Sequence, residues 1–480
     1  MEKTSWLPDA ELEKSIEGWI AEHREEMIKD IRELVAVPSV SGEKEGKFPF
    51  GAPCGEVLDL ALKKAKDYGF DTENYDYYCG GCRMKGSEEG ELGMFAHLDV
   101  VPIGEGWEYP PLECTEKDGY LIGRGVGDNK GPAVAALYAM RFLKEHSISL
   151  KHDVLLYFGC SEEKGMGDIE HYVEMGKLPD FSIVPDTDFS VCYGEKGIFR
   201  ATVKIPSDGN LKELCGGSVV NVIPAEAVAR VRTESPEKAE LLRQQLEGFD
   251  NISANISKEG TREVTVKAKG LSRHAAFPEG SVNALHLLAE ALCETGALTG
   301  KANKAVKGLA VLTGSSHGET TGIEFEDKET GKLTCCGTVA RLEEGILSLS
   351  FDVRYPASFA GEQVREGLGK AAEELGFELV ETEDSSPSFV SPERPEIKVL
   401  CEISDRVLGK AYKPYTMGGG TYARHLTNAV GFGPGIPDRE NPFPAGRGQG
   451  HQPDECIAVK QLTDGCKAYV LALLALDKIV

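Results

Sequence analysis

The sequence predicts an α/β domain with a mixed, largely parallel sheet and flanking helices, into which an α+β domain is inserted. Apolar strands alternate with helical segments before residue 190. Strands with one exposed face dominate residues 191–395, and helical patterns return after them. At 480 residues, the chain is also too long for one typical hydrophobic core. We therefore expect a discontinuous domain, residues 1–190 and 396–480, around an inserted domain of residues 191–395.

The first part of the chain alternates helices with strands that are buried on both faces. Apolar residues at helical spacing predict the helices, and short continuous apolar runs predict the strands. Strands that alternate with helices favour parallel pairing, so the strand ends should share one edge of the sheet. The expected helices cover residues 9–36, 55–68 and 132–146, and the expected strands cover residues 92–101, 154–159 and 181–184.

The inserted domain has the period-two pattern of antiparallel strands with one solvated face. Strands are expected over residues 196–204, 263–269, 334–342 and 346–354, and helices over 282–292 and 360–375. Residues 381–395 are acidic and rich in Ser and Pro, which predicts a linker. A helix over 396–408 and a buried C-terminal helix that includes 469–476 then complete the first domain.

Composition excludes several classes of protein. The 53 basic and 78 acidic residues give a net charge of −25, which repels phosphate backbones and anionic membranes. No segment is apolar and long enough to span a bilayer, and residues 1–20 lack the pattern of a signal peptide. The 13 scattered cysteines fit a reducing cytoplasm. The lone Cys79-Gly-Gly-Cys82 motif predicts a hairpin turn rather than a structural zinc site.

Residues able to bind metal follow three of the predicted strands. His97 and Asp99 lie at the end of the first, Glu162-Glu163 follow the second, and Asp186 follows the third. Residues two apart on a strand point to the same face, so Asp99 is placed to hold the second nitrogen of a ligating His97. Each segment alone also fits a plainer interpretation, such as a core histidine or a solvated acidic pair. Convergence of the strand ends makes a joint site the better explanation.

Two glycine-rich segments supply further ligand types. Asp128 ends the turn Gly123-Arg-Gly-Val-Gly-Asp128, and His451 lies within Gly448-Gln-Gly-His451. A nucleotide site is disfavoured, because GxxxxGK[ST] is absent and GxGxxG would need glycine at position 128. A carboxylate there suits a cation and can bridge two metals, although a helix-capping Asp is the simpler alternative.

Together these residues supply the components of a two-metal hydrolase. Of the adjacent pair, one carboxylate can bind metal while the other accepts a proton from water. The inserted domain adds polar groups in apolar surroundings. His274 could donate to an oxyanion, Arg354 could bind a carboxylate or simply pair with Asp352, and the remaining candidates are Asn221 and the turn Gly418, Gly419 and Gly420.

The sequence resembles the dinuclear zinc family that includes acetylornithine deacetylase, carboxypeptidase G, aminoacylase and the PepV-like dipeptidases, over nearly its whole length. The likeness to PepV-like dipeptidases is the greatest. Its basis is Ala96-His-Leu-Asp-Val-Val-Pro102, Gly123-Arg-Gly125 before Asp128, Ser161-Glu-Glu163, Pro179-Asp-Phe181 before Pro185-Asp186, Gly194-Glu-Lys-Gly197, Gly419-Gly-Thr-Tyr422 and Gly450-His-Gln-Pro453.

The resemblance implies two zinc ions per chain, with manganese or cobalt as possible substitutes. His97, Asp128 and Asp186 would hold one ion. Asp128, Glu163 and His451 would hold the other, so that Asp128 bridges. The resemblance further implies that Asp99 orients His97, that Glu162 is the general base, and that the inserted lid contributes Asn221, His274 and Arg354. Asn129 stands where the family often has Asp, and we expect metal binding to tolerate it.

The 205 residues of the inserted domain match the doubled lid of PepV-like members, which implies a monomer. The expected function is a cytoplasmic metallopeptidase that cleaves short unblocked dipeptides, with Xaa-His among the possible substrates. An N-acyl amino acid deacylase with the same dinuclear chemistry is the alternative. A non-catalytic binding protein is a third hypothesis, but it should have lost a ligand or the base, and the sequence retains all of them.

Overall fold

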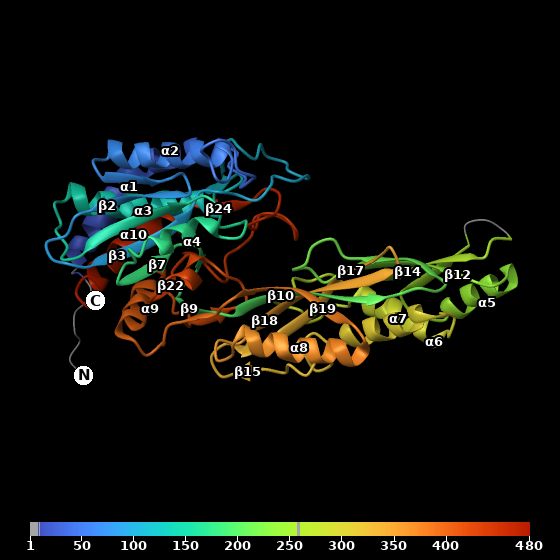
Figure 1. Ribbon diagram of the computed structural model, residues 1–480. Helices are drawn as coiled ribbons and strands as arrows, with labels where there is room; N and C mark the ends of the chain where they lie inside the picture. The colour runs from blue at the N-terminus through green and yellow to red at the C-terminus, as the bar shows by residue number, and fades with distance from the viewer. Residues whose placement is uncertain (1–7, 9, 257–259) are drawn as a thin grey trace. The chain divides into compact units, whose positions relative to one another are not determined.

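The computed structural model describes residue 8, residues 10–256 and residues 260–480, so the first residue of the helix predicted over 9–36 lies outside it. The chain divides into two compact units (Figure 1). Unit 1 comprises Met1–Gly194, Phe389–Tyr415 and Gly420–Val480, and unit 2 comprises Glu195–Ser388 and Thr416–Gly419. Within the described residues, no helix has both the length and the apolar character needed to cross a membrane.

Unit 1 is built on a mixed sheet with strands in the order β1-β2-β6-β3-β7-β22-β9. The central strands β6, β3, β7 and β22 pair in parallel, whereas β1 with β2, β2 with β6, and β22 with β9 pair antiparallel. The bounds are β1 Asp71–Tyr75, β2 Cys79–Met84, β3 Glu91–His97, β6 Asp153–Gly159, β7 Phe181–Val184, β9 Cys192–Glu195 and β22 Ala429–Gly431.

Helices cover both faces of this sheet, because its central strands are apolar on both sides. Leu92, Met94 and Ala96 of β3 belong to the larger core, and Phe95 belongs to a smaller core on the opposite face. The larger core packs against α1 (Ala10–Val35), α2 (Ala52–Asp67), α3 (Lys130–Glu145), α9 (Pro395–Leu408) and α10 (Val459–Leu476). The smaller core packs against α4 (Gly167–Glu174) and the 3₁₀ helix η1 (Tyr422–His425).

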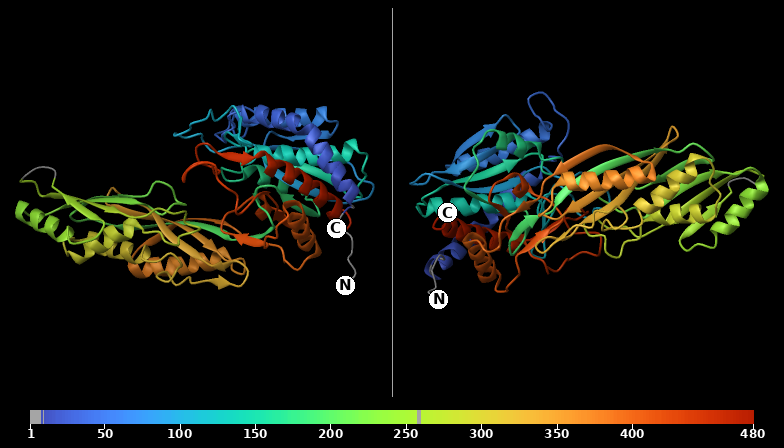
Figure 2. Two further views of the ribbon diagram at one scale, coloured as in Figure 1. Left: turned by 180° about the vertical axis from the view of Figure 1, so that it is seen from behind. Right: turned by 60° about the horizontal axis from the view of Figure 1, so that its bottom comes forward.

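Unit 2 is an antiparallel sheet in the order β13-β14-β12-β11-β17-β18-β10-β19, with helices on one face (Figure 2). Alternation in β10 buries Phe199, Ala201 and Val203 beneath the helices. The strands are β10 Gly197–Pro206, β11 Leu211–Gly216, β12 Glu226–Arg232, β13 Ile252–Asn255, β14 Glu263–Lys269, β17 Thr334–Glu343, β18 Ile346–Tyr355 and β19 Glu378–Ser385. The helices are α5 Pro236–Leu246, α6 Ala284–Glu294, α7 Lys301–Leu312 and α8 Gly361–Leu375.

The sheet of unit 2 consists of two halves with the same spatial arrangement of four strands and two helices. One half has the order β13-β14-β12-β11 with α5 and α6, and the other has β19-β10-β18-β17 with α7 and α8. The halves join where β11 pairs antiparallel with β17, with Cys215 opposite Arg341 and Gly216 opposite Ala340. The first half is inserted in sequence between β10 and α7 of the second.

The remaining strands are short. They are β4 Thr115–Lys117, β5 Tyr120–Ile122, β8 Thr187–Asp188, β15 Glu326–Asp327, β16 Gly331–Lys332, β20 Ser388–Phe389, β21 Tyr415–Met417, β23 Pro434–Gly435 and β24 Cys456–Ala458.

Three sequence-based expectations about local structure are wrong. Strand β3 ends at His97, so Asp99 lies beyond it in a loop rather than on the same strand. Much of the expected linker is strand, because β19 pairs with β10 along the edge of the unit 2 sheet. Cys79 and Cys82 lie in strand β2 rather than in a turn, and they belong to cores on opposite faces of the sheet.

Candidate metal centre

The candidate metal-ligand residues of unit 1 gather where the parallel strands of its sheet end. Strands β6, β3 and β7 are parallel neighbours, and His97 at the end of β3 lies opposite Gly159 at the end of β6. Glu162 and Glu163 follow β6, and Asp186 follows β7. This juxtaposition is the one expected from the carboxyl ends of parallel strands.

Asp128 lies between two imidazoles, with one carboxylate oxygen facing each. Its Oδ1 is 3.0 Å from Nε2 of His97, and its Oδ2 is 3.1 Å from Nε2 of His451. His97 Nε2 also lies 3.6 Å from Oδ2 of Asp186, and His451 Nε2 lies 3.0 Å from Oε1 of Glu163. The five side chains therefore form two donor sets that share Asp128.

The loop that carries His451 comes close to Asp128. A Cβ atom on Gly450 would lie 3.2 Å from Oδ2 of Asp128, so a larger residue would press on the shared carboxylate. Close packing against Asp128 thus explains why glycine precedes His451, which the sequence pattern alone does not show.

Asp99 organises two parts of the centre. Nδ1 of His97 donates to the backbone carbonyl of Asp99 at 2.9 Å, and the Asp99 carboxylate lies 3.4 Å from the same nitrogen. The two carboxylate oxygens accept hydrogen bonds from the backbone N–H groups of Glu162 and Glu163, each at 3.0 Å. With Nδ1 donating, Nε2 of the neutral His97 ring presents its lone pair to the centre.

Glu162 lies beside the donor set of His97. One oxygen of its carboxylate is within 4.8 Å of ligand atoms from His97 and Asp186. Burial, and then the carboxylates of Asp186, Glu163 and Asp99, raise the pKa of Glu162 well above its usual range, although His97 opposes this shift.

The electrostatics of the centre suit bound cations. Burial and neighbouring carboxylates raise the pKa values of Glu163 and Asp186, because their negative charges repel one another. Burial alone would lower the pKa of His97, but the carboxylates of Asp186, Asp128 and Asp99 raise it well above normal. Hydrogen bonds that the His451 ring donates to the carboxylates of Asp128 and Glu163 raise the pKa of His451 to about 11. Divalent cations would neutralise this crowded charge, and a set of imidazoles and carboxylates suits zinc.

Asn129 has a role that the sequence interpretation missed. Its Nδ2 donates to Oδ1 of Asp186 at 2.9 Å and to the carbonyl of Pro185 at 2.6 Å, and its Oδ1 accepts from the backbone N–H of His97 at 3.3 Å. An ionised carboxylate at this position could not donate to Asp186. The amide therefore holds Asp186 in place and leaves Oδ2 directed towards His97.

In unit 2, Arg354 is buried, and hydrogen bonds from all three of its guanidinium nitrogens fix its orientation. Its Nε and Nη2 donate to the two carboxylate oxygens of Asp352 at 2.7 and 2.8 Å, and its Nη1 donates to the carbonyl of Gly418 at 2.9 Å. The ion pair with Asp352 therefore exists, but only 4% of Arg354 is exposed, so it is not a surface pair. Gly418 and Gly419 lie in this unit, and Gly420 lies in unit 1.

Asn221 and His274 lie on paired segments of unit 2. The backbone carbonyl of Asn221 accepts from the N–H of Ala275 at 2.8 Å, and Val222 forms an isolated bridge with His274. The N–H of Ala276 donates to Nδ1 of His274 at 3.1 Å, so the neutral ring carries its hydrogen on Nε2. This is the tautomer that can donate to an oxyanion.

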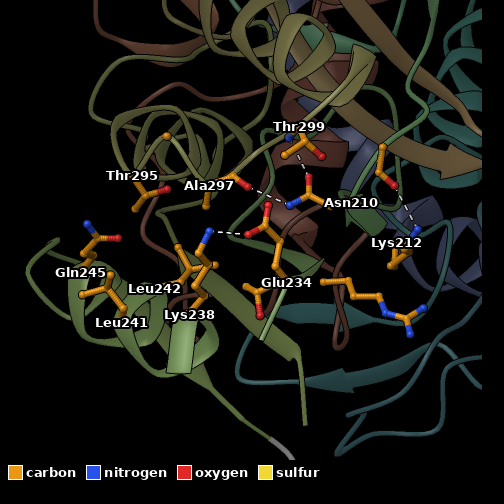
Figure 3. Close-up of a pocket in the computed structure, with 14 residues that line it drawn as sticks. Asn210, Lys212, Glu234, Lys238, Leu241, Leu242, Gln245, Thr295, Ala297 and Thr299 are labelled. Carbon is orange, nitrogen blue, oxygen red and sulfur yellow. Dashed lines mark hydrogen bonds and ion pairs between the residues drawn. The ribbon is translucent and has the colours of Figure 1, made fainter. Parts of the chain in front are cut away.

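Unit 2 also contains a cavity of about 570 Å³ that involves none of the candidate site residues (Figure 3). It lies between β11, β12, α5 and the α6–α7 turn. Asn210 on its wall is already engaged, because its side chain donates to Ala297 and accepts from Thr299. Lys238 pairs with Glu234.

Residues 93–475 match the sequence profile of "Peptidase family M20/M25/M40". The chain belongs to this family. It is therefore a metallopeptidase, a hydrolase that acts on peptide bonds. A Bacillus subtilis (strain 168) relative named "Putative dipeptidase YtjP" is 31% identical over 472 residues, covering 95% of this chain and 98% of the relative.

Solved structures share the fold of this M20 metallopeptidase at low sequence identity. Human carnosine dipeptidase 1 is 16% identical with a TM-score of 0.59, covering 98% of this chain and 100% of that one. The dipeptidase Dug1p of Saccharomyces cerevisiae is 14% identical with a TM-score of 0.58, covering 97% and 98%. These likenesses bear on the fold, and the dipeptidase-like character follows from the family and its closer sequence relatives.

Proposed function

We propose that this metallopeptidase is a dipeptidase that hydrolyses short, unblocked dipeptides at a dinuclear zinc centre. The division of the Asp128 carboxylate between His97 and His451 supports the proposal most directly. In this assignment His97, Asp128 and Asp186 hold one ion, and Asp128, Glu163 and His451 hold the other. Manganese or cobalt would be able to replace zinc, since the donors are imidazoles and carboxylates.

The proposed chemistry assigns proton transfer to Glu162. Two bound divalent cations supply the Lewis acidity that makes water nucleophilic near neutral pH and polarises a peptide carbonyl. Glu162 accepts a proton from the attacking water and delivers it to the leaving amine. Asp99 supports this step because it fixes the backbone of Glu162 and the ring of His97.

We assign substrate binding to unit 2 acting as a lid. His274 would donate through Nε2 to the oxyanion, in keeping with the hydrogen bond that Nδ1 accepts from Ala276. Arg354, Asn221 and the segment Gly418–Gly420 would bind the free carboxylate of the substrate. The pairing of Arg354 with Asp352 and Gly418 orients its guanidinium for this task. Capture of a terminal carboxylate would limit the length of the substrate.

A substrate panel on metal-reconstituted protein tests the proposal. Protein stripped with a chelator is reloaded with zinc, manganese or cobalt and assayed on free dipeptides, N-acetylated dipeptides, tripeptides and N-acyl amino acids. Preference for free dipeptides is expected. Hydrolysis of N-acyl amino acids with none of dipeptides would overturn the assignment and identify a deacylase.

The role of Glu162 needs a separate variant. E162Q should lose at least about 100-fold in kcat while it still binds two metal ions per chain, measured by elemental analysis. E396Q is the matched control, because Glu396 is a buried glutamate in the first turn of α9 in unit 1 that pairs with Arg394. Full activity in E162Q would rule out Glu162 as the base.

A further inference from the structure

A buried carboxylate outside the two donor sets holds the turn that presents Asp128. Oε1 of Glu455 accepts hydrogen bonds from the backbone N–H groups of Gly125, Gly127 and Asp128, at 3.0, 3.0 and 3.1 Å. Its Oε2 accepts from Nη1 of Arg124 at 2.6 Å. Glu455 and Arg124 are each 1% exposed. One side chain therefore accepts hydrogen bonds from three backbone N–H groups of the same turn.

The position of Glu455 in the chain gives this contact a second consequence. It lies four residues after His451, in the segment between β23 and β24. The same segment thus carries a proposed ligand of the second ion and the anchor for the carboxylate shared by both ions. A shift of this segment would move His451 and the Asp128 turn together.

We propose that Glu455 is a positioning residue that sets the Asp128 carboxylate between the two metal ions. This inference rests on the proposed function, because it takes Asp128 as the bridging ligand. Glu455 touches neither substrate nor metal in this assignment. It acts through the three backbone N–H groups that it accepts from. Without Glu455, these groups would need water or a rearranged backbone as a hydrogen-bond acceptor. Outer groups of this kind typically change metal affinity or activity about 10- to 100-fold.

The neighbouring residue Asp454 offers a matched control. It is also fully buried, accepts backbone N–H groups from Glu108 and Tyr109 at 2.9 and 3.0 Å, and pairs with Arg447. It lies on the same segment as Glu455 but contacts residues 108–109 instead of the Asp128 turn. Loss of its charge therefore removes a buried ion pair from the segment and leaves the contacts of Glu455 with the Asp128 turn in place.

The experiment compares E455Q with D454N in the full chain. Apo-protein is titrated with Co²⁺, and affinity, stoichiometry and the visible absorption spectrum are measured, together with the thermal unfolding of the apo form. E455Q should bind Co²⁺ about 10- to 100-fold more weakly with an altered spectrum, whereas D454N should stay within about threefold of wild type with the wild-type spectrum. Equal behaviour of the two variants would overturn the inference.

A double variant distinguishes positioning from general destabilisation. If Glu455 acts through Asp128, E455Q should weaken Co²⁺ binding in wild type but add little to the loss already caused by D128N. Additive losses would contradict the inference. If E455Q fails to fold, E455D, which keeps the charge but shortens the reach, provides the same comparison. Wild-type protein that binds fewer than two ions would count against the proposed function itself.

Discussion

The backbone nitrogen of Glu162 lies 3.0 Å from Oδ1 of Asp99, a residue 63 positions earlier in the chain. Oδ2 of the same carboxylate accepts from Glu163. The proposed base and its neighbouring proposed ligand therefore take their orientation from one aspartate, which also contacts the ring of His97.

Replacement of Asp99 by Asn should impair catalysis more than folding. Asn has only one acceptor oxygen in its side chain, and its NH₂ group cannot accept a hydrogen bond. One of the two backbone N–H groups of Glu162 and Glu163 would therefore lose its acceptor. We expect kcat to fall by about 10- to 100-fold, measured on protein saturated with metal. D153N is the control, because Asp153 accepts from the backbone of Gly86 at the opposite end of β6. Equal kcat values in D99N and D153N would contradict this role.

Replacement of Asp186 by Asn should change stability in opposite directions with and without metal. Burial and neighbouring carboxylates raise the pKa of Asp186, so its charge opposes folding of the apo-protein near pH 7. The neutral amide should raise the midpoint temperature of thermal unfolding of the apo form. It should also reduce the stabilisation by zinc, which for wild type is about 2.7 kcal/mol at 100 times the dissociation constant.

Calorimetry with and without zinc checks this prediction for Asp186. D188N is its control, since Asp188 lies two residues further on and outside the set of ligand atoms around His97. A lower apo midpoint for D186N would show that the carboxylate contributes more through its hydrogen bond with Asn129 than it costs through repulsion.

His425 should make the apo-protein less stable in mild acid. Burial, with a smaller effect from Arg424, lowers the pKa of His425 to about 4. The unfolded chain gains a proton near pH 6.5, whereas the folded chain does not until about pH 4. Stability contributed by neutral His425 is therefore present above pH 6.5 and is lost as the pH falls towards 4.

The comparison of wild type with H425Q isolates this component. Urea unfolding of both apo-proteins between pH 4 and 7.5 should show their difference in unfolding free energy shrinking as the pH falls. Metal is removed because metal binding itself depends on pH. A difference that is independent of pH would contradict the lowered pKa of His425, and an NMR titration of its ring would provide a direct reading.

Phe277 should influence substrate preference. Its side chain is 60% exposed, its ring centroid lies 6.2 Å from that of His274, and its N–H donates to the His274 carbonyl. Under the proposed function, F277A should raise KM for dipeptides with large apolar side chains by roughly 10-fold, with a smaller effect on Ala-Ala. L241A is the control, because Leu241 is 55% exposed but lines the separate cavity of Figure 3. Unchanged preference in F277A would exclude this contact.

The sequence predicted best those parts of the centre that follow local rules. Apolar runs placed β6 and β7 within one residue of their observed bounds, and the parallel arrangement then brings His97, Glu163 and Asp186 to one edge. The Asp128 turn and the His451 loop were recognised by residue type and by resemblance. Their assignment to individual metal ions stays a prediction.

Other features depend on contacts that no local pattern encodes. The hydrogen bond from the Asp128 backbone to Glu455 joins residues 327 positions apart, and the contacts of Asn129 with Asp186 join two separate loops. The acidic stretch mistaken for a linker forms β19 because an edge strand tolerates charge on its exposed sides. The apolar pattern continues past His97 and so predicts a strand that includes Asp99, although the pairing of β3 ends at His97.

The position of β22 has a consequence for the order in which the protein assembles. This strand contains residues 429–431 yet lies between β7 and β9, strands that precede residue 196. During synthesis, the unit 1 sheet therefore remains in two pieces while the ribosome translates more than 230 further residues. The main body of unit 2 leaves the ribosome within that interval and can fold first. The proposed metal centre, which needs His451, becomes complete only after residue 451 has also left the ribosome.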